Sequence, residues 1–145
     1  MSTQDYSELR RTYKEIQIGE TASRSRTITE SDVFTFAELI DDSNPVHLDA
    51  EYAKTTMFGE RIAHGMHSAS FFTTLIATRL PGIEGIYVSQ DLKFIRPVRI
   101  GDTITAHAEV VEKNDSKRRI TLKTTVKNQR DELVIDGKAV IAVMR

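Results

Sequence analysis

Asp42 and His47 are the two side chains whose types and spacing most directly suggest acid–base chemistry. Asn44 and Pro45 lie between them, an Asn-Pro pair favours a turn, and proline keeps the preceding residue out of the helical conformation. We therefore expect Asp42 and His47 on either side of a fixed bend, where a carboxylate and an imidazole can act on one water. Each also has a structural interpretation, because Asp in a turn commonly binds the backbone and a single His is more often structural than catalytic.

Gly65 opens an apolar segment that the sequence predicts to be a helix over 65–79, ending before Pro81. The first N–H groups of a helix lack partners within the helix and attract negative charge. Gly65 is therefore a candidate backbone donor to an oxyanion, although a glycine here can also serve only to permit a turn or close packing. The segment is apolar on every side, which indicates a buried helix, and a domain this small can bury one only by wrapping a sheet around it.

Two shorter helices are predicted to position the acid–base pair. The string Thr-Glu-Ser-Asp at 29–32 is similar to a capping box, and the apolar residues that follow up to Ile40 lie at helical spacing. This helix delivers the chain to Asp42. Asp49 can cap a second helix over 50–54.

Five segments are predicted to be strands. The first, 22–28, is a modest candidate of alternating polar and small residues, and the other four alternate between apolar and polar residues: 86–94, 104–110, 120–126 and 135–143. Such alternation predicts one face on a core and the other in solvent, which is typical of an antiparallel sheet. Helices followed by a strand meander indicate the α+β class. We expect one domain over 1–145, with a curved antiparallel sheet around the central helix and a flexible terminus over 1–11.

The string Asp-Ser-Asn-Pro-Val-His at 42–47, followed by His-Gly-Met at 64–66, resembles the hydratase motif of the MaoC-like dehydratase family. The resemblance covers the chain from about Thr27 onward and extends to 85–87, 94–98 and 101–102. The most similar members are the short, single-domain (R)-specific enoyl-CoA hydratases. The resemblance implies the hot-dog fold, a curved antiparallel sheet wrapped around a long helix.

By position, the resemblance makes Asp42 and His47 the catalytic pair and Gly65 the residue whose N–H binds the thioester oxygen. Ser70 matches a serine that lines the site in some members, and we expect Asn44, Met66 and Tyr87 beside it in the substrate-binding set. Asn44 is expected to act by fixing the loop.

Two departures from the family pattern lie close to this motif. Asp41 stands where many relatives have a small residue, and His67 stands where they often have an apolar one. Asp41 places a second carboxylate near the site, which bears on the charge expected there.

The implied activity is reversible addition of water to a trans-2-enoyl-CoA, with no cofactor beyond the coenzyme A of the substrate and no metal. The implied assembly is a homodimer, or a higher oligomer built from dimers, that joins two sheets. An acyl-carrier-protein dehydratase, a thioesterase and a non-catalytic acyl-CoA-binding subunit are the alternatives. The motif argues against the thioesterase, and the presence of both Asp42 and His47 argues against the non-catalytic subunit.

Composition bounds the remaining classes of function. The 145 residues carry a net charge of −1, which does not favour a nucleic-acid partner. The chain contains no cysteine, so disulfides and thiolate metal sites are excluded. No segment is typical of a signal peptide or a membrane span. We expect a soluble cytoplasmic protein with no membrane partner.

Other candidate sites are weaker. His64, His67 and His107 lack the spacing of a metal site, and His64 is expected to hold its loop by a hydrogen bond to backbone. The basic cluster at 117–119 is most simply a solvated hairpin end. Its functional alternative is contact with the phosphates of coenzyme A, for which Lys93, Arg96 and Arg99 are rival candidates.

Overall fold

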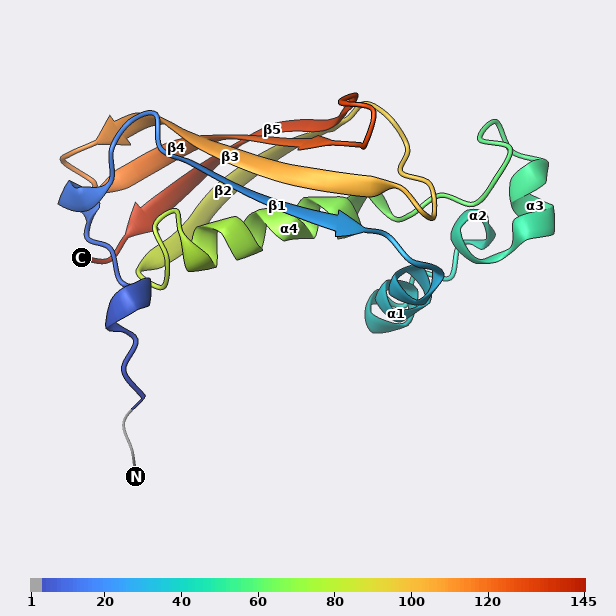
Figure 1. Cartoon of the computed structure of the whole chain (residues 1–145), viewed down its shortest axis with the longest axis horizontal. Helices are drawn as coiled ribbons and strands as arrows, with labels where there is room; N and C mark the ends of the chain where they lie inside the picture. The colour runs from blue at the N-terminus through green and yellow to red at the C-terminus, as the bar shows by residue number, and fades with distance from the viewer. Residues whose placement is uncertain (1–3) are drawn as a thin grey trace.

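The computed structural model describes residues 4–145, and its core is a five-stranded antiparallel sheet curved over one long helix, α4 (Figure 1). The strand order is β1-β3-β4-β5-β2, so β1 and β2 form the two edges. The helix spans Gly65–Thr78, and the strands are β1 Thr21–Thr27, β2 Gly85–Phe94, β3 Thr103–Asn114, β4 Arg119–Lys127 and β5 Leu133–Val143. The predicted α+β hot-dog architecture is confirmed, and all five strands lie where the alternation placed them.

Three helices gather beyond one end of the sheet, away from the termini (Figure 1). They are α1 Glu30–Ile40, α2 Pro45–Leu48 and α3 Ala50–Lys54. The predicted capping box begins α1, where the Thr29 and Asp32 side chains each accept the other's backbone N–H at 3.1 Å. The Asp49 side chain accepts the N–H of Tyr52 and starts α3. Local capping thus fixes the helices that bring Asp42 and His47 together.

The core lies between α4 and the concave face of the sheet. Phe72, Leu75 and Ile76 of α4 are almost fully buried, and alternate residues of β3 and β4 face them. Burying these side chains supplies most of the driving force for wrapping the sheet around the helix. No helix among residues 4–145 is long and apolar enough to cross a membrane.

Two predictions about burial are wrong for the single chain. The alternation in β2 does not place one face on the core, because Ile86, Val88 and Phe94 are 42–53% exposed and a bulge interrupts the register between Tyr87 and Ser89.

The sheet also covers only one side of α4, which leaves an exposed row containing Met66, Ser70, Thr73 and Ala77. An edge strand with a single partner and a helix covered on one side leave an apolar surface open on β2 and the adjoining part of α4.

The predicted flexible terminus is only partly tested, since residues 1–3 lie outside the described part. From Ser7 the chain forms two short 3-10 helices, η1 Ser7–Leu9 and η2 Tyr13–Glu15. The Leu9 carbonyl accepts the N–H of Ile83 at 3.1 Å, so this part of the terminus is hydrogen-bonded to the loop after α4.

Candidate active site

Asp42 is placed by a sharp reversal at the end of α1. Asp41 adopts the left-handed conformation (φ 57°) and ends the helix, and the N–H of Asp42 then donates to the Ala37 carbonyl at 3.0 Å. One Asp42 carboxylate oxygen accepts the N–H of Asn44 at 3.2 Å, which is the turn role expected of an Asp here. The other oxygen faces His64. The turn therefore occupies one carboxylate oxygen of Asp42 and leaves the other free to face His64.

The bend predicted at Asn44-Pro45 is instead the start of α2, the four-residue helix that carries His47. The Asn44 side chain accepts the N–H of Val46 at 3.2 Å, and proline suits the first helical position because it has no N–H to leave unpaired. Asn44 therefore fixes the loop, as predicted, and the short helix presents His47 toward Asp42.

His47 is held in one tautomer by the backbone. Its Nδ1 lies 2.7 Å from the carbonyl oxygen of Ile62, and because a carbonyl can only accept, Nδ1 carries the proton of that bond. The Nε2 lone pair is then available to take a proton. His47 is buried, and burial lowers its pKa from the usual value, with the neighbouring His64 ring acting in the same direction. The hydrogen bond to Ile62 and the Asp42 charge oppose this shift, but burial dominates, so His47 is a neutral base near pH 7.

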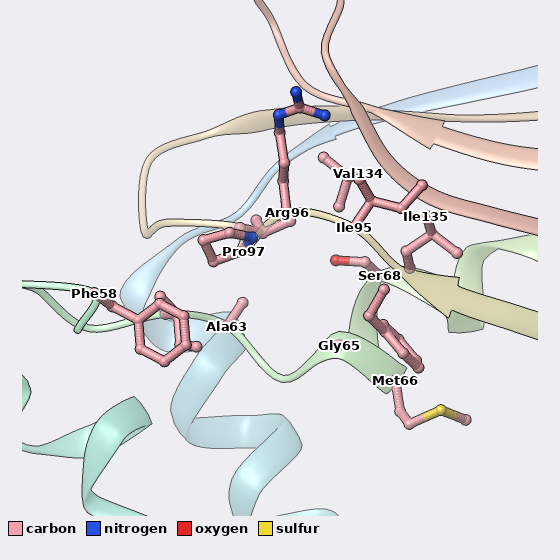
Figure 2. A pocket seen from close by; sticks show the side chains of 13 residues that line it. Phe58, Ala63, Gly65, Met66, Ser68, Ile95, Arg96, Pro97, Val134 and Ile135 are labelled. Carbon is pink, nitrogen blue, oxygen red and sulfur yellow. The ribbon is translucent and has the colours of Figure 1, made fainter. Parts of the chain in front are cut away.

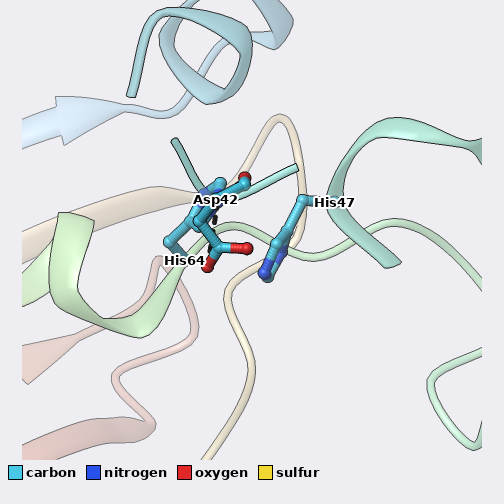
Figure 3. A group of neighbouring side chains, drawn as sticks. All are labelled: Asp42, His47 and His64. Carbon is cyan, nitrogen blue, oxygen red and sulfur yellow. Dashed lines mark hydrogen bonds and ion pairs between the residues drawn. The ribbon is translucent and has the colours of Figure 1, made fainter. Parts of the chain in front are cut away.

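His64 completes the cluster, and sequence reasoning assigned it only a structural bond. The predicted bond is present, since Nε2 lies 3.1 Å from the Asp42 carbonyl oxygen, but the same atom is 3.7 Å from the Asp42 carboxylate. The ring also stacks on His47 with centroids 3.8 Å apart. Figure 3 shows the three side chains converging, and one ligand atom of each lies within 4.8 Å of the others. In the sequence, the position of His64 directly before Gly65 was the feature that could have placed it in this cluster.

Two imidazoles and a carboxylate at these distances are a plausible ligand set for a divalent metal. Coordination through His64 Nε2 would move its proton to Nδ1, which is buried without a hydrogen-bond partner. The bond from Nε2 to the Asp42 carbonyl would also be lost. The arrangement is therefore better suited to holding and moving protons than to binding metal.

Gly65 begins α4, and no side chain caps this end of the helix. It borders a cavity of about 470 Å³, and Figure 2 shows Met66, Ser68, Arg96 and Pro97 around it. Asp42, His47 and His64 do not line this cavity. Ile62, Ala63 and Gly65 do, so the segment Ile62–Gly65 separates the acid–base cluster from the cavity and contributes to both.

Gly65 also meets a steric requirement. A Cβ added at this position would lie 2.7 Å from two carbons of the Phe94 ring, well inside van der Waals contact. The close-packing interpretation of Gly65 therefore has a physical basis, independent of any role for its N–H.

A model of the MaoC like domain matches residues 14–132 of this chain. An (R)-specific enoyl-CoA hydratase of Rhodospirillum rubrum is 47% identical over 131 residues, covering 90% of each chain. A mitochondrial 3-hydroxyacyl-(acyl-carrier-protein) dehydratase of Solanum lycopersicum is 41% identical over 126 residues, covering 86% of this chain and 75% of that one. Among solved structures, the (R)-hydratase of A. caviae superposes with a TM-score of 0.87 at 38% identity, covering 90% of this chain and 98% of that one.

The chain belongs to the MaoC-like family. The matches span the fold and the cluster described above, so the predicted resemblance is confirmed.

The substrate-binding residues predicted for this MaoC-like domain gather at a second hollow. Met66, Ser70 and Tyr87 line it, and Asn44 does not. It is an apolar groove of about 600 Å³ between α1, α4 and β2, and Met66 borders both this groove and the cavity. The Ser70 hydroxyl donates to the His67 carbonyl, and the Tyr87 hydroxyl donates to the Gln90 side chain at 2.9 Å. Burial raises the pKa of Tyr87 to about 12, so its hydroxyl keeps its proton.

The two departures from the family pattern have different surroundings. Asp41 is exposed and outside the cluster. His67 is buried, and its ring is nearly parallel to that of Phe36 (13°) at 4.8 Å. Burial lowers the pKa of His67, so its charged form is disfavoured in the folded state.

Among the basic candidates for phosphate contact, Arg96 lies at the cavity. Its guanidinium donates to the Leu133 carbonyl at 3.0 Å and lies 3.5 Å from the Glu132 carboxylate. Arg99 is engaged by the Phe58 carbonyl and by Glu60. The 117–119 cluster sits at the β3–β4 turn, at the opposite end of the sheet from α1–α3 (Figure 1). Arg96 borders the cavity, whereas Lys93, Arg99 and residues 117–119 do not.

Burial of His47 and His67 makes stability depend on pH. Both pKa values lie below the ordinary 6.5 in the folded state, so the unfolded chain binds more protons and stability falls as pH drops through 6.5. We expect urea unfolding from pH 7.5 to pH 5 to show this decline, and the His67→Phe variant, which keeps a ring against Phe36, to show a shallower one. Equal slopes for the two proteins would contradict this account.

Proposed function

We propose that this chain is an (R)-specific enoyl-CoA hydratase, a hydro-lyase that adds water reversibly across the C2=C3 bond of a trans-2-enoyl-CoA. The observation that carries the proposal is the convergence of the Asp42 carboxylate with a buried His47 whose Nε2 is free to accept a proton. Support comes from the hydratase named among the relatives and from the structural match to another.

In the proposed mechanism, one water lies between Asp42 and His47. His47 Nε2 takes a proton from the water as its oxygen bonds to C3, and Asp42 orients the water. A proton is delivered to C2 from this pair, so the net change is addition of one water. No cofactor is needed, because conjugation with the thioester already makes C3 electrophilic.

Gly65 is proposed to stabilise the charge that develops on the thioester oxygen. Its N–H stands at the start of α4, where the helix dipole favours negative charge. The apolar groove of Met66, Ser70 and Tyr87 is proposed to hold the acyl chain, because its lining is largely hydrocarbon. Arg96, at the cavity, is the proposed contact for a coenzyme A phosphate.

A 3-hydroxyacyl-(acyl-carrier-protein) dehydratase is the second candidate, favoured by the similarity to the Solanum lycopersicum enzyme. The acid–base chemistry is the same and only the carrier of the thioester differs. Comparing kcat/KM for crotonyl groups carried by coenzyme A and by acyl-carrier protein separates the two.

We further propose that the enzyme is at least a homodimer in the cytoplasm. The outer edge of β2 has no strand partner among residues 4–145, and an exposed apolar edge invites pairing with another strand. A second copy joined there would also cover the open face of α4 and place the acyl groove at or near the interface.

Loss of the enoyl-thioester absorbance of crotonyl-CoA tests the activity directly. We expect Asp42→Asn and His47→Gln each to lower kcat by on the order of a hundredfold or more, as for loss of a general acid or base, with unchanged melting. The matched control is Asp41→Asn, which alters the adjacent carboxylate at an exposed position where asparagine tolerates the left-handed conformation. Near wild-type turnover in either of the first two variants would reject the assigned roles.

The two roles of Gly65 are separable through Phe94. Gly65→Ala is expected to lower the melting temperature, because the new methyl group meets the Phe94 ring, and Gly65→Ala with Phe94→Leu should recover part of that loss. If the Gly65 N–H serves the oxyanion, kcat of the double variant should stay roughly tenfold or more below that of Phe94→Leu alone. Equal kcat values would restrict Gly65 to packing.

Sedimentation equilibrium tests the assembly. We expect a species of at least twice the chain mass, and we expect Val88→Lys on the β2 edge to dissociate it and lower turnover. Val111→Lys is the matched control, because Val88 and Val111 are 42% and 43% exposed and each sits at a bulge. The backbone of the adjacent Val110 is already bonded to Gly19 and Glu20. An active wild-type monomer would exclude the proposed dimer.

A further inference from the structure

The cavity beside Gly65 contains a polar group that no step above uses. Ser68 lies three residues further along α4, and helix residues three apart share a face. Both residues line the cavity, and Figure 2 shows the Ser68 hydroxyl directed away from α4 into the ring of lining side chains.

The Ser68 hydroxyl is buried without a partner. The residue is 0% exposed, and its Oγ has no hydrogen bond in the described chain. Three other hydroxyls on α4 behave differently, since those of Ser70, Thr73 and Thr78 each donate to a backbone carbonyl three or four residues earlier. An unpaired buried donor destabilises the folded state, so its presence indicates a partner that arrives with a ligand.

We infer that Ser68 is a second hydrogen-bond donor to the thioester carbonyl oxygen of the substrate, acting together with the N–H of Gly65. This inference rests on the proposed function only for the identity of the thioester. The first turn of α4 carries both donors, and no side chain caps its start. Two donors aimed at one oxygen stabilise the negative charge that grows there as water adds to C3.

Access to Ser68 requires side chains at the cavity to move. The Phe94 ring packs over Gly65 and Ile95 lies beside it, and both are about half exposed (53% and 46%). Neither side chain is enclosed by the rest of this chain, so each can change to another staggered rotamer. The substrate is therefore expected to displace Phe94 and Ile95 as its carbonyl reaches the two donors.

Ser68→Ala separates binding from packing. Removing an unpaired hydroxyl should leave the melting temperature unchanged or raise it, while kcat/KM for crotonyl-CoA falls about tenfold, as for loss of a hydrogen bond in the transition state. Thr78→Val is the control on the same helix, because its exposed hydroxyl donates to the Thr74 carbonyl far from the cavity. Unchanged kcat/KM in Ser68→Ala would overturn the inference.

A binding cycle tests the contact without turnover. Butyryl-CoA and the thioether S-butyl-CoA differ in the carbonyl oxygen, so their affinity ratio by calorimetry reports what that oxygen contributes. We expect this ratio to be about fivefold larger for the wild type than for Ser68→Ala, and equal ratios would overturn the inference. If crotonyl-CoA is not hydrated but the ratios differ, the proposed function fails and the Ser68 contact stands.

Discussion

The hydrogen bond from the His47 ring to the Ile62 carbonyl ties the two halves of the site together. It sets the imidazole tautomer, and Ile62 belongs to the segment that leads directly into Gly65. That segment is fixed from the other side as well, because the Ala63 N–H donates to the Val98 carbonyl at 2.7 Å. The acid–base pair and the helix start are thus held at a set spacing, which chemistry on one small acyl group requires.

Unpaired polar atoms concentrate around the first turn of α4. His64 Nδ1, His67 Nδ1 and Ser68 Oγ are the buried side-chain atoms without partners among residues 4–145, and all three belong to residues within three positions of Gly65. Leaving such groups unpaired reduces stability, and functional sites commonly tolerate that loss in exchange for groups available to a ligand. The same helix is packed conventionally further along, at Phe72 and Ile76.

The open apolar surface of β2 and α4 is the second feature that the single chain leaves incomplete. Ile86, Val88 and Phe94 expose hydrocarbon on an unpaired strand, and the groove beside them is lined by Met66 and Tyr87. Partner association and acyl binding would both remove this surface from water. In the proposed dimer, substrate binding and subunit association therefore bury parts of the same apolar surface.

Much of this protein follows from its sequence because the relevant forces are local. The capping box at Thr29 and Asp32, the alternation of β3 and β4 and the fixed separation of Asp42 and His47 depend on residues close in the chain. Period and capping therefore predicted the elements and their class, and the short spacing between Asp42 and His47 predicted that these two side chains converge.

Only the tertiary structure could decide which side chains meet. His64 joins Asp42 across 22 residues, and Ser68 rather than Ser70 faces the cavity beside Gly65. The exposure of β2 depends on its position at the edge of the sheet, which its alternation does not encode. Periodicity constrains which face of an element is apolar, but the packing of distant elements determines what covers that face and which polar groups remain unpaired.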